Sequence, residues 1–180
     1  MENTETVRNT VRWLKNIVVG LNLCPFAGPV LAADSIQIEV SDATELEGVL
    51  ADVLTQLDKI QSADEIEVAT SILIFPHAMH NFDEYWAMAE IASDLLVEVG
   101  LDNIIQIATF HPEYCFDGVH RDDISNYTNR SPYPMLHFIR EAQLTRALEA
   151  YSNPDEIPQN NIRRLEQLGK TEFLKLLAAK

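Results

Sequence analysis

Residues 66–110 read IEVATSILIFPHAMHNFDEYWAMAEIASDLLVEVGLDNIIQIATF, and this stretch decides the fold that the sequence predicts. Its two largely apolar runs, Ile66 to Phe75 and Ile104 to Phe110, are typical of buried strands. Between them, apolar residues recur at helical spacing and predict a helix, with Asn81 to cap its start and Gly100 to end it. The stretch therefore predicts a strand–helix–strand unit.

The residues before this unit extend the same pattern. SIQIEV at 35–40 alternates polar and apolar residues, as a half-exposed strand does, and a strong apolar stripe from Leu46 to Ile60 predicts a helix after it. Strand, helix, strand, helix, strand indicates an α/β fold with a small, mostly parallel three-stranded sheet (βαβαβ) flanked by helices. We expect the two apolar strands inside the sheet and SIQIEV at its edge.

Helices are added at both ends of the chain. Thr4 to Leu21 has apolar residues at helical spacing, and Pro134 suits the first turn of a helix from Met135 to Tyr151. Ile162 to Leu168, stopped by Gly169, predicts another helix, and a short last one follows. The 180 residues are an ordinary length for one domain, so we expect 1–180 to fold as a single unit.

Charge and composition exclude several classes of partner. The formal net charge is −15, which argues against nucleic acids and anionic membranes as partners because both need a basic patch. Between Asp34 and Asp102 the only basic residue is Lys59, so we expect acidic helix faces that are either solvated or a docking surface. No apolar run reaches the length of a membrane span, and the start lacks the features of a signal peptide, which predicts a cytoplasmic location.

The two cysteines are predicted to be free thiols. Cys24 and Cys115 are too few for a disulfide framework, and neither belongs to a CxxC pair of the kind that binds structural zinc. Cys24 precedes Pro25 after a predicted helix end, where a half-buried small hydrophobic residue and a reactive thiol are both possible.

A polar segment, Thr109 to Arg140, leaves the last apolar strand and carries most of the candidate site residues. Long structureless segments in compact domains are commonly functional. Ligands of parallel sheets bind outside the carboxyl ends of the strands, so we expect the loop 111–134 to fold over that edge. His111 directly follows one predicted strand, and His77 follows another after Pro76.

Three kinds of chemistry fit these residues. The first is a metal site made by His77, His80 and His111 with an aspartate, although no established metal-binding motif is present. The second is anion binding by arginine forks, for which Arg121, Arg130 and Arg140 are candidates unless they pair with neighbouring carboxylates. There is no glycine-rich phosphate loop, and no motif implies a cofactor.

The third is acid–base or nucleophilic catalysis. His111 can act as acid or base if Asp122 or Asp123 orients it, and Cys24 or Ser131 can act as nucleophile. The amide and hydroxyl residues Asn126 to Ser131 have an alternative role, because such side chains satisfy the backbone of a buried loop.

Three motifs carry a resemblance to a known family: LNLCPFA at 21–27, ATFHPEY at 108–114 and NYTNRSPYPMLHFIRE at 126–141. The chain resembles the bacterial family catalogued as domain of unknown function 1415. The resemblance implies no activity, substrate or cofactor, but it gives weight to the residues that match its pattern. The chain departs from the family pattern at Cys115 and His120. The resemblance therefore implies that residues Cys115 to Arg121 are the part of the polar segment least suited to chemistry. The matching residues of interest are Cys24, His111, Asp122, Asp123, Asn126, Asn129, Arg130, Ser131, His137 and Arg140.

These observations predict an enzyme that acts on a small metabolite in a polar pocket formed by residues 109–140, and the arginines favour an anionic one. His111 would exchange protons, and Arg130 and Arg140 would bind the anion. The alternative is a non-catalytic interaction protein with a structural loop and acidic docking faces. A pocket around His111, Cys24 and Arg130 favours the enzyme, whereas structural hydrogen bonds at these residues argue against it. Asn126, Asn129, Ser131 and His137 complete the predicted substrate contacts, and the sequence leaves the oligomeric state open.

Overall fold

The computed structural model describes residues 2–149, 151 and 153–178. Helices alternate with the strands of one sheet, and a π-helical segment (η1) and two 3-10 segments (η2, η3) complete the regular structure. In chain order the elements are α1 (Glu2–Trp13), η1 (Leu14–Val19), α2 (Ala27–Ala32), β1 (Ile36–Val40), α3 (Leu46–Ser62), β2 (Thr70–Ile74), α4 (Phe82–Glu98), β3 (Ile105–Phe110), η2 (Ile124–Thr128), β4 (Met135–Arg140), α5 (Glu141–Glu149), η3 (Pro154–Glu156), α6 (Ile157–Leu168) and α7 (Lys170–Ala178).

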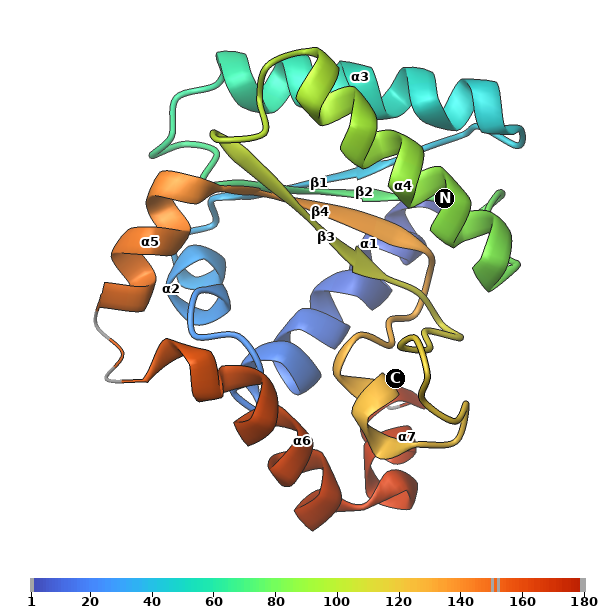
Figure 1. The fold of residues 1–180 in the computed structure, drawn as a ribbon, viewed down its shortest axis with the longest axis vertical. Coiled ribbons are helices and arrows are strands. Elements are labelled where there is room, and N and C mark those ends of the chain that lie inside the picture. The colour runs from blue at the N-terminus through green and yellow to red at the C-terminus, as the bar shows by residue number, and fades with distance from the viewer. Residues whose placement is uncertain (1, 150, 152, 179–180) are drawn as a thin grey trace.

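The sheet is mixed and has four strands in the order β1-β2-β4-β3 (Figure 1). β1 and β2 run parallel, whereas β4 runs antiparallel to both of its neighbours. The α/β class is confirmed. The prediction of a mostly parallel three-stranded sheet is wrong in the number of strands: β1, β2 and β3 run in the same direction, and the additional strand β4 makes the sheet mixed.

The strand that the sequence did not reveal is Met135–Arg140, which we predicted as the start of a helix reaching Tyr151. Among the described residues of this range, which exclude 150, only Glu141–Glu149 is helical. The run MLHFIR is almost entirely buried because it pairs with β2 on one side and β3 on the other. Six residues are too few to establish a period, so partners distant in the sequence decide their conformation.

The position of β4 changes the surroundings of the long polar segment. β4 separates β2 from β3, so β3 lies at an edge of the sheet and not inside it, while β1 lies at the other edge as predicted. β2 and β3 both run antiparallel to β4, so their carboxyl ends lie at the same end of the sheet, where β4 begins. Residues 111–134 therefore connect the two adjacent antiparallel strands β3 and β4 at this end of the sheet.

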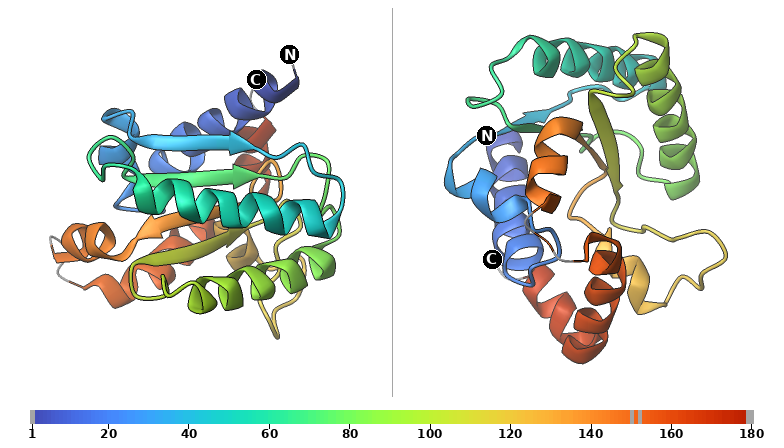
Figure 2. Two further views of the ribbon diagram at one scale, coloured as in Figure 1. Left: turned by 90° about the horizontal axis from the view of Figure 1, so that it is seen from above. Right: turned by 60° about the vertical axis from the view of Figure 1, so that its left-hand side comes forward.

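Helices cover both faces of the sheet. α3 and α4 lie on one face, while α1 and α2 lie on the other, with α6 and α7 farther out (Figures 1 and 2). We call the second face the α1 face. None of the helices among the described residues is both long and apolar enough to cross a membrane. The core beneath α3 and α4 includes Val53, Tyr85, Met88 and Phe138, and the core on the α1 face includes Trp13, Ile17, Ile72 and Phe173.

Two helix ends predicted from single residues are confirmed. The side chain of Asn81 accepts hydrogen bonds from the backbone N–H groups of Asp83 and Glu84 and so caps α4. Gly100 follows the helix with a φ angle of 73°, a left-handed conformation that glycine adopts at little cost.

Candidate functional site

His111 follows β3 as predicted, but its side chain is fully buried. Its ring packs against Phe82 and Tyr85 of α4, with ring centroids 5.4 and 5.0 Å apart. The backbone N–H of Glu113 donates to Nδ1 at 2.9 Å, and Nε2 lies 3.0 Å from the carbonyl oxygen of Met79. Because Nδ1 accepts a hydrogen bond, the neutral ring carries its proton on Nε2 and donates it to Met79.

Both nitrogens of His111 are thus used in structural hydrogen bonds. Burial lowers the pKa of His111, and the hydrogen bond to Met79 partly offsets this effect. The ring joins the turn before α4 to the end of β3. This geometry gives no support to His111 as a catalytic acid or base.

The predicted metal site also lacks support. Among the residues with described positions, no group of three or more His, Cys, Asp and Glu side chains is arranged to hold a metal ion. His80 lies close enough to His111 to influence its pKa. However, a ligand role for His111 would require one of its two hydrogen bonds to break, and nothing brings His77 into a common site with these two residues.

The loop 111–134 leads into the first residue of β4, and Arg140 is the last residue of that strand. Arg140 therefore lies at the opposite end of the sheet from the loop. Its Nη2 donates to the carbonyl oxygens of Ile60 and Ala63 at 2.5 and 2.9 Å, and Nε donates to Val68 at 3.2 Å. Ile60 and Ala63 lie at the carboxyl end of α3, where carbonyl groups lack partners within the helix and attract a positive charge. The buried Arg140 therefore caps α3 and takes no part in a site at the loop.

Arg130 is bound within the polar segment. Its Nε donates to the carbonyl oxygen of Tyr114 at 3.3 Å and its Nη2 to that of Arg121 at 2.8 Å. The guanidinium carbon lies 4.1 Å from the ring centroid of Tyr127, so the group stacks on that ring. Arg130 thus holds both ends of the loop together.

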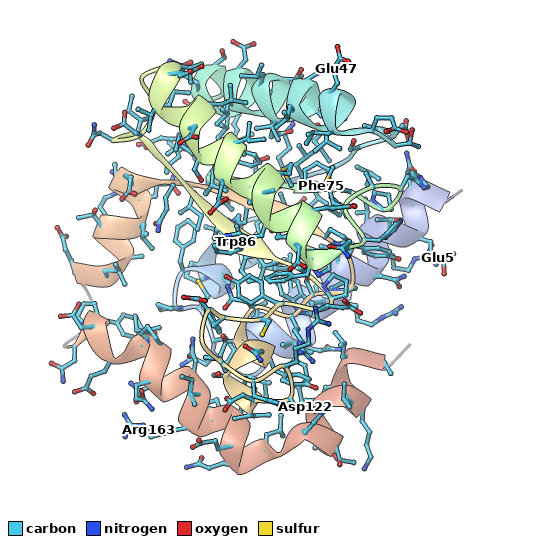
Figure 3. All side chains as sticks on the ribbon, turned by 45° about the vertical axis from the view of Figure 1, so that its right-hand side comes forward. Glu5, Glu47, Phe75, Trp86, Asp122 and Arg163 are labelled. Atoms are coloured by element: carbon cyan, nitrogen blue, oxygen red, sulfur yellow. The ribbon has the colours of Figure 1, made fainter. Side chains whose placement is uncertain are left out.

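The two aspartates are exposed and do not contact the ring of His111. Asp122 lies at the surface (Figure 3) and pairs with Lys170 at 2.9 Å. The hydrogen bond and charge of Lys170 lower the pKa of Asp122. Asp123 accepts hydrogen bonds from the backbone N–H and hydroxyl of Ser125, which lower its pKa and cap η2. Neither carboxylate orients His111.

Asn126 organises the loop from its centre. The side chain is fully buried, and its Oδ1 accepts a hydrogen bond from the backbone N–H of Phe116 at 2.9 Å. Its Nδ2 donates to the carbonyl oxygens of His120 and Arg121. Buried backbone groups need such partners, so the side chain fixes residues 115–121 on the loop's second half.

We expect Asn126→Ala to lower the free energy of unfolding by about 2 kcal/mol, because three loop backbone groups lose their partner. Asn103→Ala is the matched control: Asn103 is exposed and bonds to the adjacent Asp102. This control should change the free energy of unfolding by no more than about 0.5 kcal/mol. Urea unfolding measures both, and equal losses would contradict the role given to Asn126.

Ser131 and Asn129 also bond to the backbone. The hydroxyl of Ser131, a buried residue, donates to the carbonyl oxygen of Tyr133 at 2.7 Å, so its proton is engaged. Asn129 donates from Nδ2 to the carbonyl oxygen of Thr109 at 3.1 Å and accepts from the hydroxyl of Thr128. Unlike Ser131, Asn129 also lines an open groove.

A groove of about 530 Å³, which we call the outer groove, runs between the polar segment, the end of η1 and α6. Its wall is mostly apolar, with hydroxyl and amide side chains among the lining residues. Asn161 of α6 is held in place by donating to the carbonyl oxygen of Leu23. The lining residues are Val18, Leu23, Cys24, Phe110, Phe116, Val119, Ser125, Thr128, Asn129, Pro158, Asn161 and Ile162.

A smaller cavity of about 160 Å³ lies under the sheet on the α1 face. Its accessible wall is apolar. Ile72, Ala108 and Ile139 line it from the sheet, and helices α1 and α2 close the other side with residues such as Trp13 and Val30. The cavity and the outer groove share three wall residues, Val18, Cys24 and Phe110, so they adjoin.

His137 lies in the cavity wall, beside its partner Thr70. The Thr70 hydroxyl donates to the carbonyl oxygen of Phe138 at 2.7 Å and lies 2.6 Å from Nε2 of His137. Because the only hydroxyl proton goes to Phe138, Nε2 must carry a proton and donate it to Thr70. Burial lowers the pKa of His137 to about 4, so the ring is neutral at physiological pH.

Cys24 is the predicted site residue that lies where the cavity and the groove meet. Burial raises the pKa of its thiol, while hydrogen bonds from the backbone of Phe26 and Ala27 oppose this effect. Since thiolates are the reactive form, the side chain is a weak nucleophile at neutral pH. It contributes a small apolar surface to both walls.

Comparison with known proteins agrees with the resemblance seen in the motifs. The model of the family described as "Protein of unknown function (DUF1415)" matches residues 5–175. The chain belongs to the DUF1415 family. No curated protein and no solved structure matches it.

In this DUF1415 protein, the structure gathers only some of the predicted residues. Cys24, Asn129 and His137 line the adjoining groove and cavity, while His111 and Arg140 are committed elsewhere. Sequence reasoning missed the apolar walls from α1, α2 and α6, because a core residue and a cavity residue have the same helical spacing. It also undervalued residues 115–121, which supply Phe116 and Val119 to the groove.

Proposed function

We propose that this protein binds a small, uncharged and largely apolar molecule in the cavity and the outer groove. One observation carries the proposal: an apolar cavity of about 160 Å³ adjoins an open groove of about 530 Å³ through the shared residues Val18, Cys24 and Phe110. Ligand sites are typically concave and mostly apolar with a few polar groups. The cavity has room for roughly five water-sized groups of a ligand.

The groups around the site favour an uncharged ligand. A charged group would lose its hydration in the apolar cavity without gaining a partner. Thr128, Asn129 and Asn161 in the outer groove offer hydroxyl and amide contacts for the polar end of a ligand. We therefore expect an amphipathic molecule whose apolar chain enters the cavity.

This proposal keeps one part of the function predicted from sequence and sets another aside. Residues 109–140 supply half of the outer groove, as expected of the pocket-forming segment. Catalysis by His111 and anion binding by Arg130 and Arg140 have no support in their hydrogen bonds. The alternative, a structural loop in an interaction protein, gains support from the loop's internal bonds, but it does not account for the cavity. The absence of a nucleic-acid partner and the cytoplasmic location stay predictions.

Trp13 provides the test, because its buried ring lines the cavity. In a Trp86→Phe background Trp13 is the only tryptophan. We expect 1-hexanol to change its fluorescence saturably, and Ala108→Leu to weaken this binding at least about tenfold by filling the cavity. Ala87→Leu, at an exposed position of α4, should leave the affinity unchanged.

Alkylation of Cys24 by N-ethylmaleimide gives a second readout that does not require a cavity variant. Hexanol should slow the reaction of Cys24, which lines the site, but not that of Cys115, whose Sγ bonds to the carbonyl oxygen of Val119. Mass spectrometry of peptides distinguishes the two thiols. An unchanged hexanol affinity in folded Ala108→Leu protein, together with no protection of Cys24, would overturn the proposal.

A further inference from the structure

A second groove, of about 470 Å³, also has Trp13 among its lining residues but differs from the cavity in chemical character. It runs between α1, the turn at Pro132 and Tyr133, and the end of α7. We call it the arginine groove because Arg8 and Arg12 line it. They are one helical turn apart on α1, a spacing that places two side chains on the same helix face.

Neither arginine is neutralised by a carboxylate among the residues that the structure describes. The five ion pairs found there use Lys59, Arg121, Arg146, Lys170 and Lys175. The chain has 28 acidic and 13 basic residues, so carboxylates are abundant, and Glu5 itself lines the groove. Two guanidinium groups that lack an ion pair with any described carboxylate of so acidic a protein indicate a place for an anion from outside.

A hydrogen-bond chain prepares the groove for a ligand. Nη1 of Arg12 donates to Oδ1 of Asn9 at 3.2 Å, and Nδ2 of Asn9 donates to the hydroxyl oxygen of Tyr133 at 3.0 Å. Because the Tyr133 oxygen accepts in this contact, its hydroxyl proton can be donated to another group. The half-buried Arg12, which lines the groove, is thus held in position and keeps further N–H donors, which lowers the entropy cost of binding.

The remaining wall of the arginine groove is apolar. Trp13 and Pro132 line it on one side, and Leu176 and Leu177 of α7 line it on another. A bare inorganic anion would leave these side chains without contact. An anion that carries an apolar body would bury them.

We propose that the arginine groove binds a small organic carboxylate whose apolar body packs between α1 and α7. The guanidinium forks of Arg8 and Arg12 match the two oxygens of a carboxylate. The hydroxyl of Tyr133 supplies an additional donor. This site shares Trp13 with the cavity and no lining residue with the outer groove, and it would let the protein hold an anion in addition to an uncharged ligand.

Trp13 also reports on this site, since it lines the groove. The experiment uses the full chain with Trp86→Phe and Ala108→Leu, so that Trp13 is the only tryptophan and the cavity is filled. We expect phenylacetate to change the fluorescence saturably, with an affinity that falls as salt is added. Phenylethanol, which lacks the charge, and inorganic phosphate, which lacks the apolar body, should each bind at least about tenfold more weakly.

Arginine variants locate the binding. Arg8→Gln and Arg12→Gln should each weaken phenylacetate binding about tenfold or more, corresponding to the loss of one charged contact. Arg163→Gln, at an exposed arginine of α6 that bonds to Asn160, should have no effect. Arg8 is exposed and has no described partner, so its variant should keep the fold even if Arg12→Gln does not.

Three results would overturn the proposal: no saturable response to phenylacetate, equal losses from Arg8→Gln and Arg163→Gln, or phosphate binding as tight as phenylacetate. None of these depends on hexanol. Binding of hexanol in the background with Ala108 intact, measured in parallel, tests the cavity alone. Failure of either site is therefore visible without reference to the other.

Discussion

Replacing Arg140 with methionine should lower the free energy of unfolding by about 3 kcal/mol, a large part of the total stability of a domain of this size. Arg140 is buried, and its guanidinium donates to the carbonyl oxygens of Ile60, Ala63 and Val68. Methionine keeps the apolar stem but leaves these carbonyls without a donor. The end of α3 and the start of β2 should both loosen.

Arg146→Met is the matched control for this prediction. Arg146 belongs to α5, directly after β4, and pairs with Glu65 in the α3–β2 connection at 3.3 Å, but both side chains are more than half exposed. Exposed ion pairs contribute little, so the control should lose no more than about 0.5 kcal/mol. Urea unfolding measures both variants. Hydrogen exchange should show faster exchange at the end of α3 in Arg140→Met only, and similar behaviour of the two variants would contradict the capping role.

Acid should destabilise the protein strongly between about pH 6.5 and pH 4, and His137 should be a main cause. The ordinary histidine pKa of 6.5 falls to about 4 in the folded protein because the ring is buried. Below pH 6.5 the unfolded chain binds a proton that the folded protein does not. The contribution of His137 to the free energy of unfolding is therefore fully present above pH 6.5 and is lost as the pH falls towards 4, by about 3 kcal/mol in total. Burial of His111 lowers its pKa too and acts in the same direction.

His137→Gln separates this contribution from the rest. A glutamine amide can still donate to the hydroxyl of Thr70, but it does not titrate. The free energy of unfolding, measured by urea at several pH values, should fall less steeply with acid in this variant. An unchanged slope would mean that His137 is protonated in the folded protein at a pH close to its ordinary pKa.

Much of the fold was predictable because its signals are local. Asn81 and Gly100 mark the two ends of α4 through contacts with residues two to four positions away. The stripe from Leu46 to Ile60 predicts the helix α3, and its residues Val49, Val53, Leu57 and Ile60 are buried, whereas Leu46 and Leu54 are exposed. β4 was not predictable in this way, since its register is set by β2 and β3, more than twenty residues away in the chain.

The candidate site was predictable only in outline. The sequence located the polar segment after β3 and singled out Cys24, Asn129 and His137, which do line the groove and the cavity. It gave equal or greater weight to His111 and Arg140, because residue type and position in the chain do not reveal whether a polar group has a partner. His111 bonds to Met79, 32 residues away, and Arg140 bonds to Ile60, 80 residues away.

The sequence by itself determined the α/β class, most helix and strand positions, the acidic character and the family. These properties depend on composition and on periods within one element. Only the tertiary structure decided which polar groups are satisfied internally, where the cavity lies, and that Arg8 and Arg12 lack carboxylate partners among the described residues while Arg130 and Arg140 are engaged. The reason is physical: hydrogen bonds and cavities arise between segments distant in the chain, and no local pattern records them.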